Sequence, residues 1–509
     1  MSKTLFGLAI TLVAAIISPG RAAASQPTKK LYVDVNHPHA QLAGSCSSPQ
    51  VPCLRITDAL ARAREIRYEQ MLEPGFSEET VRAIEIIITP GSYVGTFGDN
   101  TEGRLEEYPL LINVPRVTLR GATRLALDER GRPKRPLSDA AFAAAVLNDS
   151  NNTVLLMKEQ EVRQANEYVI LILPTTRLAT GQRSGGAGVT IEGLSFNVGP
   201  GAGNGAVVAA DRANGFTARG CAFASVGPLE MANSSGQIEG NLFYKGRVGA
   251  IFVRAPDASQ PNEIVVRNNV AIQKENGGLY LSAAGFNGAV GINGISIYNL
   301  KRHAAEFQYE PFVMPAHTYA NALVENNLFT GAGVGSPLLG YGVRIAGSDG
   351  QVSAPGTRGE MDVTLRRNEL TNNRDGFTLD ASFRHRSSSG TWKMDIRVYL
   401  EDNTVSANSR SSAAMSFTGI RTALAPTNPP TALGLFKYAQ DSAFEITDPA
   451  GSVADMWVDH LVLDPLSGTP LNNTFIYNGS LVAPPKRSCG YPTLSPSFAP
   501  YAPTTPCAP

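Results

Sequence analysis

Ile238-Glu239-Gly240-Asn241-Leu242-Phe243 is the stretch that decides the fold, because versions of it return at intervals too wide for a helix or a hairpin. The clearest copies are Val324 to Phe329 and Leu400 to Val405. Weaker copies are Ile191 to Phe196, Ala218 to Phe223, Val266 to Ala271 and Leu365 to Leu370. Each copy reads as a strand, a polar turn and a second strand. Repeats of this length predict a fold in which every coil packs on its neighbours.

Asparagine fills the fourth position in five of these copies, at Asn241, Asn269, Asn327, Asn368 and Asn403. A coil must turn between strands, and Asn tolerates left-handed backbone angles while it bonds to neighbouring main chain. Stacked at about 4.8 Å, such side chains can also form a hydrogen-bonded ladder. We therefore predict structural roles for the five asparagines. Cys221 takes the same place in another copy, where we predict a small apolar filler of the core.

The N-terminal residues 1–24 predict a signal peptide. Lys3 precedes an apolar run from Leu5 to Ile17, and Ala22-Ala23-Ala24 offers a cleavage site. No later run approaches the roughly 18 apolar residues of a membrane-spanning helix, so no membrane span is predicted. We expect an exported protein, secreted or periplasmic, that begins near Ser25.

The charge of the chain is balanced, with 44 Lys and Arg residues against 44 Asp and Glu residues. No basic stripe is present, which argues against nucleic acid as a partner. We expect a monomer.

Two pairs of cysteines predict local disulfides. Cys46 and Cys53 flank a Ser/Pro loop, and Cys489 and Cys507 flank a Pro-rich tail at residues 484–509. Neither pair has the spacing or the nearby histidines of a zinc site, so no metal is predicted there. The acidic residues are dispersed, and a Ca²⁺ ion between loop carboxylates is an alternative without a supporting motif. We therefore expect no cofactor.

The N-terminal part of the mature chain combines a strand, a cysteine-bearing loop, a helix and a second strand. Leu31 to Val35 alternates like a strand. Apolar residues at 56, 59, 60, 63 and 66 share one helix face, which predicts an amphipathic helix over about 56–72 with Thr57 or Asp58 as its N-cap. Ile84 to Ile88 then forms a strand that runs into Pro90-Gly91-Ser92-Tyr93.

This order resembles the start of the pectin-lyase-like right-handed parallel β-helix superfamily, and the later repeats resemble its coils. The resemblance implies an all-β fold, a right-handed single-stranded parallel β-helix (β-solenoid) over residues 25–483 with an N-terminal capping helix. Residues 123–165 break the rhythm and predict an insertion with a short helix at Asp139 to Val146. Further strands are expected at Ile295 to Tyr298 and Asp455 to Leu463. The signatures of polygalacturonases, alginate epimerases, pectin methylesterases and pectate lyases are absent, so no catalytic subfamily is implied.

Enzymes that the chain resembles bind polysaccharide in a groove on the outer face of the coils, between loops. Two charged excursions are candidates for such loops, at residues 301–319 and 375–386. Elimination from an acidic sugar needs a cation for the carboxylate, a base and an acid. For these catalytic roles we predict Lys301, Arg302, His303, Tyr309, Arg384 and His385. For substrate binding we predict Glu306, Glu310, Asp375, Asp380 and Arg386.

Hydrolysis would instead need two paired carboxylates. Asp375 and Asp380 would lie about 16 Å apart in an extended strand, unless a turn intervenes or either pairs with Glu306 or Glu310.

The leading prediction is an exported carbohydrate-active protein, a polysaccharide lyase that acts on an acidic polysaccharide. One alternative is a non-catalytic carbohydrate-binding or cell-surface structural β-helix protein, in which the charged loops are ordinary solvated surface. A second alternative is a glycoside hydrolase. In each case the expected partner is a polysaccharide or other glycan, and the sequence leaves open whether the protein is an enzyme.

Overall fold

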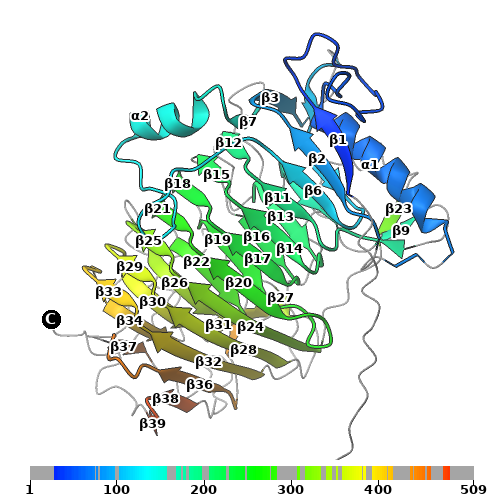
Figure 1. The fold of residues 1–509 in the computed structure, drawn as a ribbon. Helices are drawn as coiled ribbons and strands as arrows, with labels where there is room; N and C mark the ends of the chain where they lie inside the picture. The colour runs from blue at the N-terminus through cyan, green and yellow to red at the C-terminus, as the bar shows by residue number, and fades with distance from the viewer. Residues whose placement is uncertain are drawn as a thin grey trace, which may run out of the picture.

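The chain is built from three long sheets that share one core (Figure 1). The computed structural model describes residues 28–481 except 75, 78–80, 98–102, 158–167, 174–175, 179–182, 198–205, 225–228, 247–248, 275–276, 284–306, 310–315, 334–339, 347–350, 353–357, 381, 386–392, 410, 417–435, 439–440, 453–455 and 460–473. The predicted signal peptide, the Pro-rich tail with Cys489 and Cys507, and the predicted strand at 295–298 lie outside the described residues.

Sheet A is parallel throughout except for its last pair, β38 and β39. Its strands in spatial order are β1 (Lys29–Val33), β2 (Ile84–Ile88), β6 (Val117–Arg120), β11 (Thr190–Glu192), β14 (Phe216–Arg219), β17 (Gly236–Glu239), β20 (Glu263–Arg267), β24 (His317–Glu325), β28 (Arg358–Arg366), β32 (Lys393–Glu401), β36 (Ala443–Thr447), β38 (Thr474–Tyr477) and β39 (Ser480–Leu481).

Sheets B and C are all-parallel. Sheet B consists of β4 (Glu106–Glu107), β3 (Gly91–Thr96), β7 (Thr153–Met157), β12 (Ser195–Asn197), β15 (Ala222–Ala224), β18 (Leu242–Gly246), β21 (Val270–Lys274), β25 (Leu328–Thr330), β29 (Glu369–Thr371) and β33 (Thr404–Ser406). Sheet C consists of β5 (Leu110–Ile112), β8 (Ile170–Ile172), β13 (Val208–Asp211), β16 (Leu229–Ala232), β19 (Ile251–Arg254), β22 (Gly277–Ser282), β26 (Tyr341–Ala346), β30 (Asp375–Asp380), β34 (Ser411–Ser416) and β37 (Met456–Asp459).

Successive coils visit the three sheets in turn, as β17, β18 and β19 do before β20, β21 and β22. This is the arrangement of a parallel β-solenoid, in which each coil pairs with the coil before and after it. Two small sheets arise in the connections from sheet C back to sheet A. One contains β10 (Arg183–Ser184), β9 (Thr176–Leu178) and β23 (Phe307–Tyr309), and the other contains β27 (Gln351–Val352), β31 (Ser382–His385) and β35 (Phe436–Tyr438).

The core runs along the inside of the three sheets. Inward residues of consecutive strands stack on one another, because parallel strands in register place like positions about 4.8 Å apart. Phe196, Phe223 and Phe243 show this directly, with ring centroids 4.8 Å and 4.7 Å apart in nearly parallel planes. Cys221 is fully buried in the same core with a free thiol, as predicted.

The turn from sheet A to sheet B carries the predicted asparagine ladder. Asn269 donates through Nδ2 to Oδ1 of Asn327 at 3.1 Å and to the Ile238 carbonyl at 2.8 Å. The prediction that the fourth-position asparagines adopt left-handed backbone angles was wrong. The positive φ falls one residue earlier, at Gly193, Gly220, Gly240, Asn268, Asn326, Arg367 and Asp402. The fourth-position asparagine instead stays inside, where its amide satisfies the main-chain groups of the turn.

Helix α1 (Ile56–Met71) lies beside the first strands of the solenoid (Figure 1). Its buried residues Ile56, Ala59, Leu60 and Ala63 belong to the same core cluster as β1 and β2. The predicted caps Thr57 and Asp58 do not cap it, because the N-cap is Arg55, which makes no side-chain cap. Glu106 of β4 accepts hydrogen bonds from the backbone N–H groups of Ile56 and Thr57 at 2.6 and 2.9 Å, and so supplies the cap from a distant strand.

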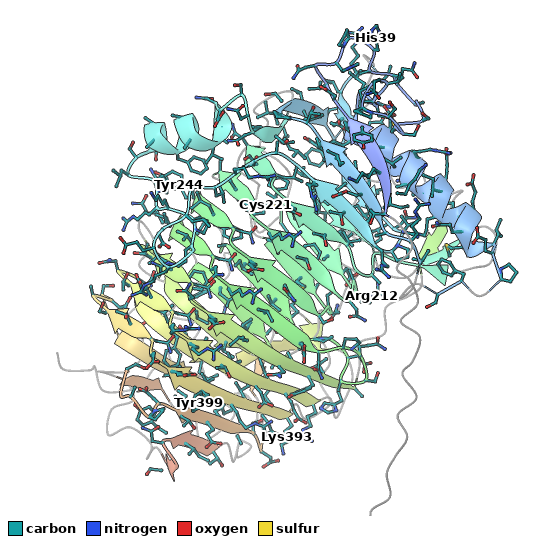
Figure 2. The ribbon with its side chains drawn as sticks, in the orientation of Figure 1. His39, Arg212, Cys221, Tyr244, Lys393 and Tyr399 are labelled. Carbon is teal, nitrogen blue, oxygen red and sulfur yellow. A yellow bond between two sulfur atoms is a disulfide. The ribbon has the colours of Figure 1, made fainter. Side chains whose placement is uncertain are left out.

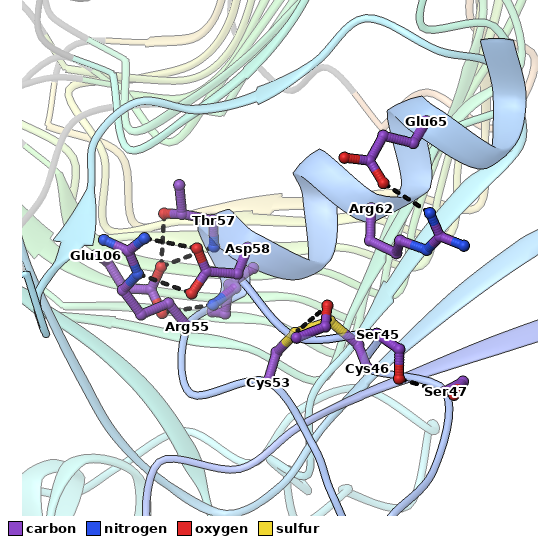
Figure 3. The surroundings of a disulfide bond; sticks show 12 residues. Ser45, Cys46, Ser47, Cys53, Arg55, Thr57, Asp58, Arg62, Glu65 and Glu106 are labelled. Atoms are coloured by element: carbon purple, nitrogen blue, oxygen red, sulfur yellow. Dashed lines mark hydrogen bonds and ion pairs between the residues drawn. A yellow bond between two sulfur atoms is a disulfide. The ribbon is translucent and has the colours of Figure 1, made fainter. Parts of the chain in front are cut away.

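The predicted disulfide between Cys46 and Cys53 is present, immediately before α1 (Figure 3). None of the helices in the described part of the chain is long and apolar enough to cross a membrane.

The insertion packs across the outside of sheet B. It contains α2 (Asp139–Phe142) and the π-helical turn η1 (Ala143–Leu147), close to the predicted helix. Phe142 stacks on Tyr244 with centroids 4.5 Å apart (Figure 2 labels Tyr244), and Phe142 and Val146 join an apolar cluster with Leu242 and Val270. Within the range predicted for the insertion, β7 at 153–157 is a paired strand of sheet B.

Candidate functional site

Most of the residues that the sequence predicted for catalysis and binding lie outside the described part of the chain: Lys301, Arg302, His303, Glu306, Glu310 and Arg386. Tyr309 ends β23, where it pairs with Thr176 of β9. Arg384 and His385 lie in β31, paired with β27. The two excursions therefore supply strands to different small sheets.

Asp375 and Asp380 form the two ends of one strand, β30. No turn intervenes between them, so their Cα atoms lie about 16 Å apart. That distance is too long for the paired carboxylates of a hydrolase. Asp375 is buried, and its register partner in the next strand is Tyr341.

The outer face of sheet C carries a different set of functional groups. Val208 and Ala210 belong to the core, so Ala209 and Asp211 of the same strand face outward. The register partners of Ala209 on successive strands form one row across the outer face of the sheet. This row consists of Leu111, Leu171, Ala209, Glu230, Phe252, Tyr280, Arg344 and Thr378. We call it the outer row. Charged and aromatic side chains on an outer face would ordinarily be solvated, yet Glu230 and Arg344 are only 7% and 5% exposed.

Two buried carboxyl groups lie next to each other on this face. Ala209 pairs with Glu230 and Asp211 pairs with Ala232, so Asp211 and Glu230 are diagonal neighbours on β13 and β16. Strand spacing and rise place their Cα atoms about 8 Å apart. Two neighbouring carboxyl groups are the machinery of glycosidic-bond hydrolysis.

Each carboxyl group lies beside an arginine, because Asp211 contacts Arg212 at 3.2 Å and Glu230 contacts Arg254 at 3.0 Å. Burial raises the pKa of Asp211 to about 6, and the negative charge of Glu230 adds to this effect, while Arg212 and Asn233 oppose it. Glu230 instead accepts a hydrogen bond from Nε of Arg254 at 3.0 Å, in a pair of which each side chain is 9% exposed. The raised pKa of Asp211 suits this group to donate a proton, and Arg254 holds the carboxyl group of Glu230 in place.

An aromatic and cationic group follows the carboxyl pair along the outer row. The rings of Phe252 and Tyr280 meet edge to face with centroids 5.5 Å apart. Cζ of Arg344 lies 4.9 Å from the Tyr280 ring centroid and 6.0 Å from that of Tyr341. These are cation–π distances. Aromatic rings and guanidinium groups together can bind the faces and the acidic groups of sugars.

Sequence reasoning missed Asp211, Glu230, Arg254, Tyr280 and Arg344, because it searched the loops between the coils. A signal was nevertheless present inside the strands. In Ile251-Phe252-Val253-Arg254 and Leu279-Tyr280-Leu281, the positions between core residues hold aromatic or charged side chains. Period-two alternation marks those positions as outward, and large rings there are unusual for a solvated sheet.

The outer face of sheet A carries many charged residues, and several of them are paired with one another. The predicted loop residue His317 lies 2.9 Å from Glu360, and Tyr319 donates to Asp362 at 2.8 Å. Lys393 and Tyr399, which Figure 2 labels, lie on the same face, and each is slightly less than half exposed. Within the described ranges, no group of three or more His, Cys, Asp or Glu side chains could hold a metal ion.

A pocket of about 180 Å³ opens between the start of α1 and β4 to β5. Its charged lining is engaged internally: Arg55 contacts Asp58 at 2.5 Å and Glu107 at 3.1 Å (Figure 3 shows the first pair). We assign it to the packing of the helix on the first coil.

The fold and the outer row define the class of protein: a parallel β-solenoid with a buried polar site on the outside of one sheet. No protein-family model and no curated protein matches the sequence. Among solved structures, the chain is similar to a DFA-IIIase variant from Arthrobacter chlorophenolicus A6 in complex with DFA-III, at 11% identity and a TM-score of 0.29, over 89% of this chain and 99% of that chain. DFA-IIIase itself matches at 13% identity and a TM-score of 0.29, over 88% and 95% of the two chains. Scores this low carry no argument about function.

Proposed function

We propose that this protein is an exported glycan-cleaving enzyme whose site is the outer face of sheet C, and that it hydrolyses a glycosidic bond. The observation that carries the proposal is the buried pair of Asp211 and Glu230, with a raised pKa on the first and Arg254 beside the second. Export is supported by the Cys46–Cys53 disulfide, because such bonds persist in oxidising compartments. Right-handed winding, a capping role for α1 and membership of the pectin-lyase-like superfamily belong to the same proposal.

The raised pKa of Asp211 assigns the acid role to this residue, and Glu230 is left as the base. Asp211 donates its proton to the glycosidic oxygen as the bond from that oxygen to the anomeric carbon breaks. Glu230 accepts a proton from a water molecule, whose oxygen forms the new bond to the anomeric carbon. The products are a hemiacetal and an alcohol, and the two carboxyl groups exchange protons with solvent to reset. Because both are nearly fully buried, the sugar must displace the groups that cover them.

A lyase acting on an acidic polysaccharide is the second candidate, and a specific observation favours it. Arg344 lies near the rings of Tyr280 and Tyr341, so a guanidinium and two phenols lie close together. The guanidinium would neutralise a uronate carboxylate, and a phenol would move the proton. This candidate predicts an unsaturated product, whereas hydrolysis predicts none.

The test is to incubate the purified mature protein with a panel of neutral and acidic glycans. New reducing ends and the ultraviolet absorbance of unsaturated sugars are followed together. Asp211→Asn and Glu230→Gln should each lower kcat by about 100-fold or more, the usual contribution of acid–base catalysis. Glu192→Gln is the matched control, because Glu192 is also paired with arginine but lies on sheet A, where it bonds Arg219 at 2.7 Å.

Hydrolysis would be supported if the wild type forms new reducing ends without ultraviolet absorbance and if Asp211→Asn and Glu230→Gln form none. If the absorbance persists in Asp211→Asn and Glu230→Gln but is lost in Arg344→Gln, the protein is a lyase and the proposal of hydrolysis is wrong. Cleavage equal to wild type in all variants would rule out this site.

A further inference from the structure

The charged groups around the carboxyl pair differ in their access to solvent. The side chains of Asp211, Glu230 and Arg254 are 0%, 9% and 9% exposed, whereas that of Arg212 is 21% exposed. Arg212 is thus the most accessible of these four groups, so it is the one that an incoming glycan can contact before the pair is uncovered.

A turn of the backbone brings Arg212 to the outer face. Arg212 directly follows the last residue of β13, and Figure 2 labels it. Neighbouring side chains of a strand point to opposite faces, so an extended Arg212 would be aimed into the core. Its φ is instead 49°, in the left-handed region that is unfavourable for residues with a side chain. In this conformation its Nε and Nη2 donate to one oxygen, Oδ2 of Asp211, at 3.4 and 3.2 Å.

The other neighbours of Asp211 do not supply a second cation in direct contact with it. Asn233 donates to Oδ1 at 3.4 Å, the register partner Ala232 is apolar, and Arg254 bonds to Glu230. Burial raises the pKa of Asp211 and the charge of Glu230 adds to this effect, while Arg212 is the largest influence that opposes it. If the guanidinium of Arg212 moved away, Asp211 would hold its proton more strongly.

We infer that Arg212 recognises the carboxylate of a uronate unit in the substrate: it pairs with Asp211 in the free enzyme and moves to the uronate when the glycan binds. This inference rests on the proposed function and narrows the substrate to an acidic glycan. A guanidinium binds a carboxylate through two parallel hydrogen bonds, which its single-oxygen contact with Asp211 does not provide. The same movement uncovers Asp211 and removes its cation, so the acid becomes protonated once the substrate is in place.

The first test compares the pH dependence of the full mature chain on a uronate-containing glycan and on its neutral, carboxyl-reduced form. The alkaline limb of kcat/KM reports the free enzyme, and that of kcat reports the enzyme–substrate complex. On the uronate-containing glycan the kcat limb should lie at higher pH than the kcat/KM limb, by about one pH unit more than on the neutral form. Equal separations, or cleavage confined to neutral glycans, would overturn the inference and leave the proposed function intact. Absence of cleavage on every glycan would instead overturn the proposed function itself.

Variants of Arg212 test the residue itself. Arg212→Gln should lower the preference for the uronate-containing glycan over its neutral form, measured as the ratio of the two kcat/KM values, by about tenfold or more. It should also move the kcat/KM limb to higher pH and leave the kcat limb in place, because the cation lies beside Asp211 in the free enzyme alone. Arg212→Lys keeps the charge and should retain part of the preference.

Arg219→Gln is the matched control, since Arg219 is also paired with a carboxylate, Glu192, but lies on sheet A. It should change neither the preference nor the two limbs. An unchanged preference in Arg212→Gln, or a kcat limb that moves together with the kcat/KM limb, would contradict the assignment of Arg212.

Discussion

Asn241 donates a hydrogen bond through Nδ2 to Oδ1 of Asn269 at 3.0 Å, although 28 positions separate the two residues in the sequence. The same oxygen of Asn269 also accepts from the backbone N–H of Asn241. Each amide thus joins its own turn to the next coil, and the ladder continues through Asn327 and Asn368 to Asn403. Each side-chain amide from Asn241 to Asn368 both donates and accepts in the ladder, so these turns from sheet A to sheet B are joined to one another by buried hydrogen bonds.

The centre of this ladder should be costly to remove. In Asn327→Ala, the Val266 carbonyl and the amide of Asn269 lose their partners in a fully buried site. We expect a loss of about 3 kcal/mol in the free energy of unfolding, measured by chemical denaturation. Asn403→Ala, at the half-buried end of the ladder, is the control and should cost clearly less, because water can replace the amide. Equal losses would show that the ladder is not the source of the stability.

The outer face of sheet A carries a second ladder, of alternating charge. Paired strands place in register Arg120, Glu192, Arg219, Glu239, Arg267, Glu325, Arg366 and Glu401. Arg219→Glu would set three carboxylates side by side and should lower stability by about 1 kcal/mol at low salt. Most of that loss should disappear in 1 M NaCl, where the Debye length is about 3 Å. The control Arg219→Gln should lose less, and a salt-independent loss in Arg219→Glu would point to packing instead.

The insertion should be held on sheet B by its buried aromatic residue. Phe142→Ala removes the ring stacked on Tyr244 and should cost about 3 kcal/mol. We expect the loss to be local, seen as faster amide exchange and proteolysis within residues 123–152 with little change in the coils. Leu137→Ala, at a side chain that is 96% exposed, is the matched control and should leave exchange unchanged. Faster exchange throughout the coils would mean that the insertion is part of the cooperative core.

The cap of α1 should make stability depend on pH. Burial raises the pKa of Glu106 to about 7 from its usual value near 4.5, against the hydrogen bonds from Ile56 and Thr57. Because the folded state then binds more protons, this contribution is fully present below about pH 4.5 and is lost as the pH rises through about 7. Glu106→Gln cannot titrate, so its melting temperature should fall less than that of the wild type between pH 5 and pH 8, the range to be scanned. Parallel curves for the two proteins would exclude Glu106 as the titrating group.

The proposed acid should set the alkaline limb of activity. Asp211 has a pKa raised to about 6, so its protonated form is present below that pH and is lost above it. We expect kcat/KM to fall as the pH rises through about 6. Asn233→Ala removes a hydrogen bond to Asp211 that favours the ionised form, so it should move this limb to higher pH. A limb that stays in place in Asn233→Ala, or one that persists in Asp211→Asn, would reject Asp211 as the acid.

The sequence by itself determined the coils. The repeated strand, turn and strand phrase predicted the pairs from β11 and β12 to β32 and β33, the buried asparagines and the place of Cys221, because all of these depend on residues close together in the chain. The local Cys46–Cys53 disulfide followed for the same reason. Even the alternation of Glu and Arg at the second position of the phrase is visible in the sequence, although its meaning appears only with the strand register.

Only the tertiary structure decided what the coils bring together. Asp211 and Glu230 become diagonal neighbours because of the length of the intervening coil with β14 and β15, and Arg132 meets Glu369 at 3.0 Å across 237 positions. The cap of α1 likewise comes from Glu106, 50 positions from Ile56. The connections between strands differ in length, and together they decide which residues of neighbouring coils come into register. No local sequence pattern encodes this register. Whether an outward side chain is solvated or buried depends on which distant segment covers it, and that is why the candidate site lay in strands where the sequence predicted only scaffold.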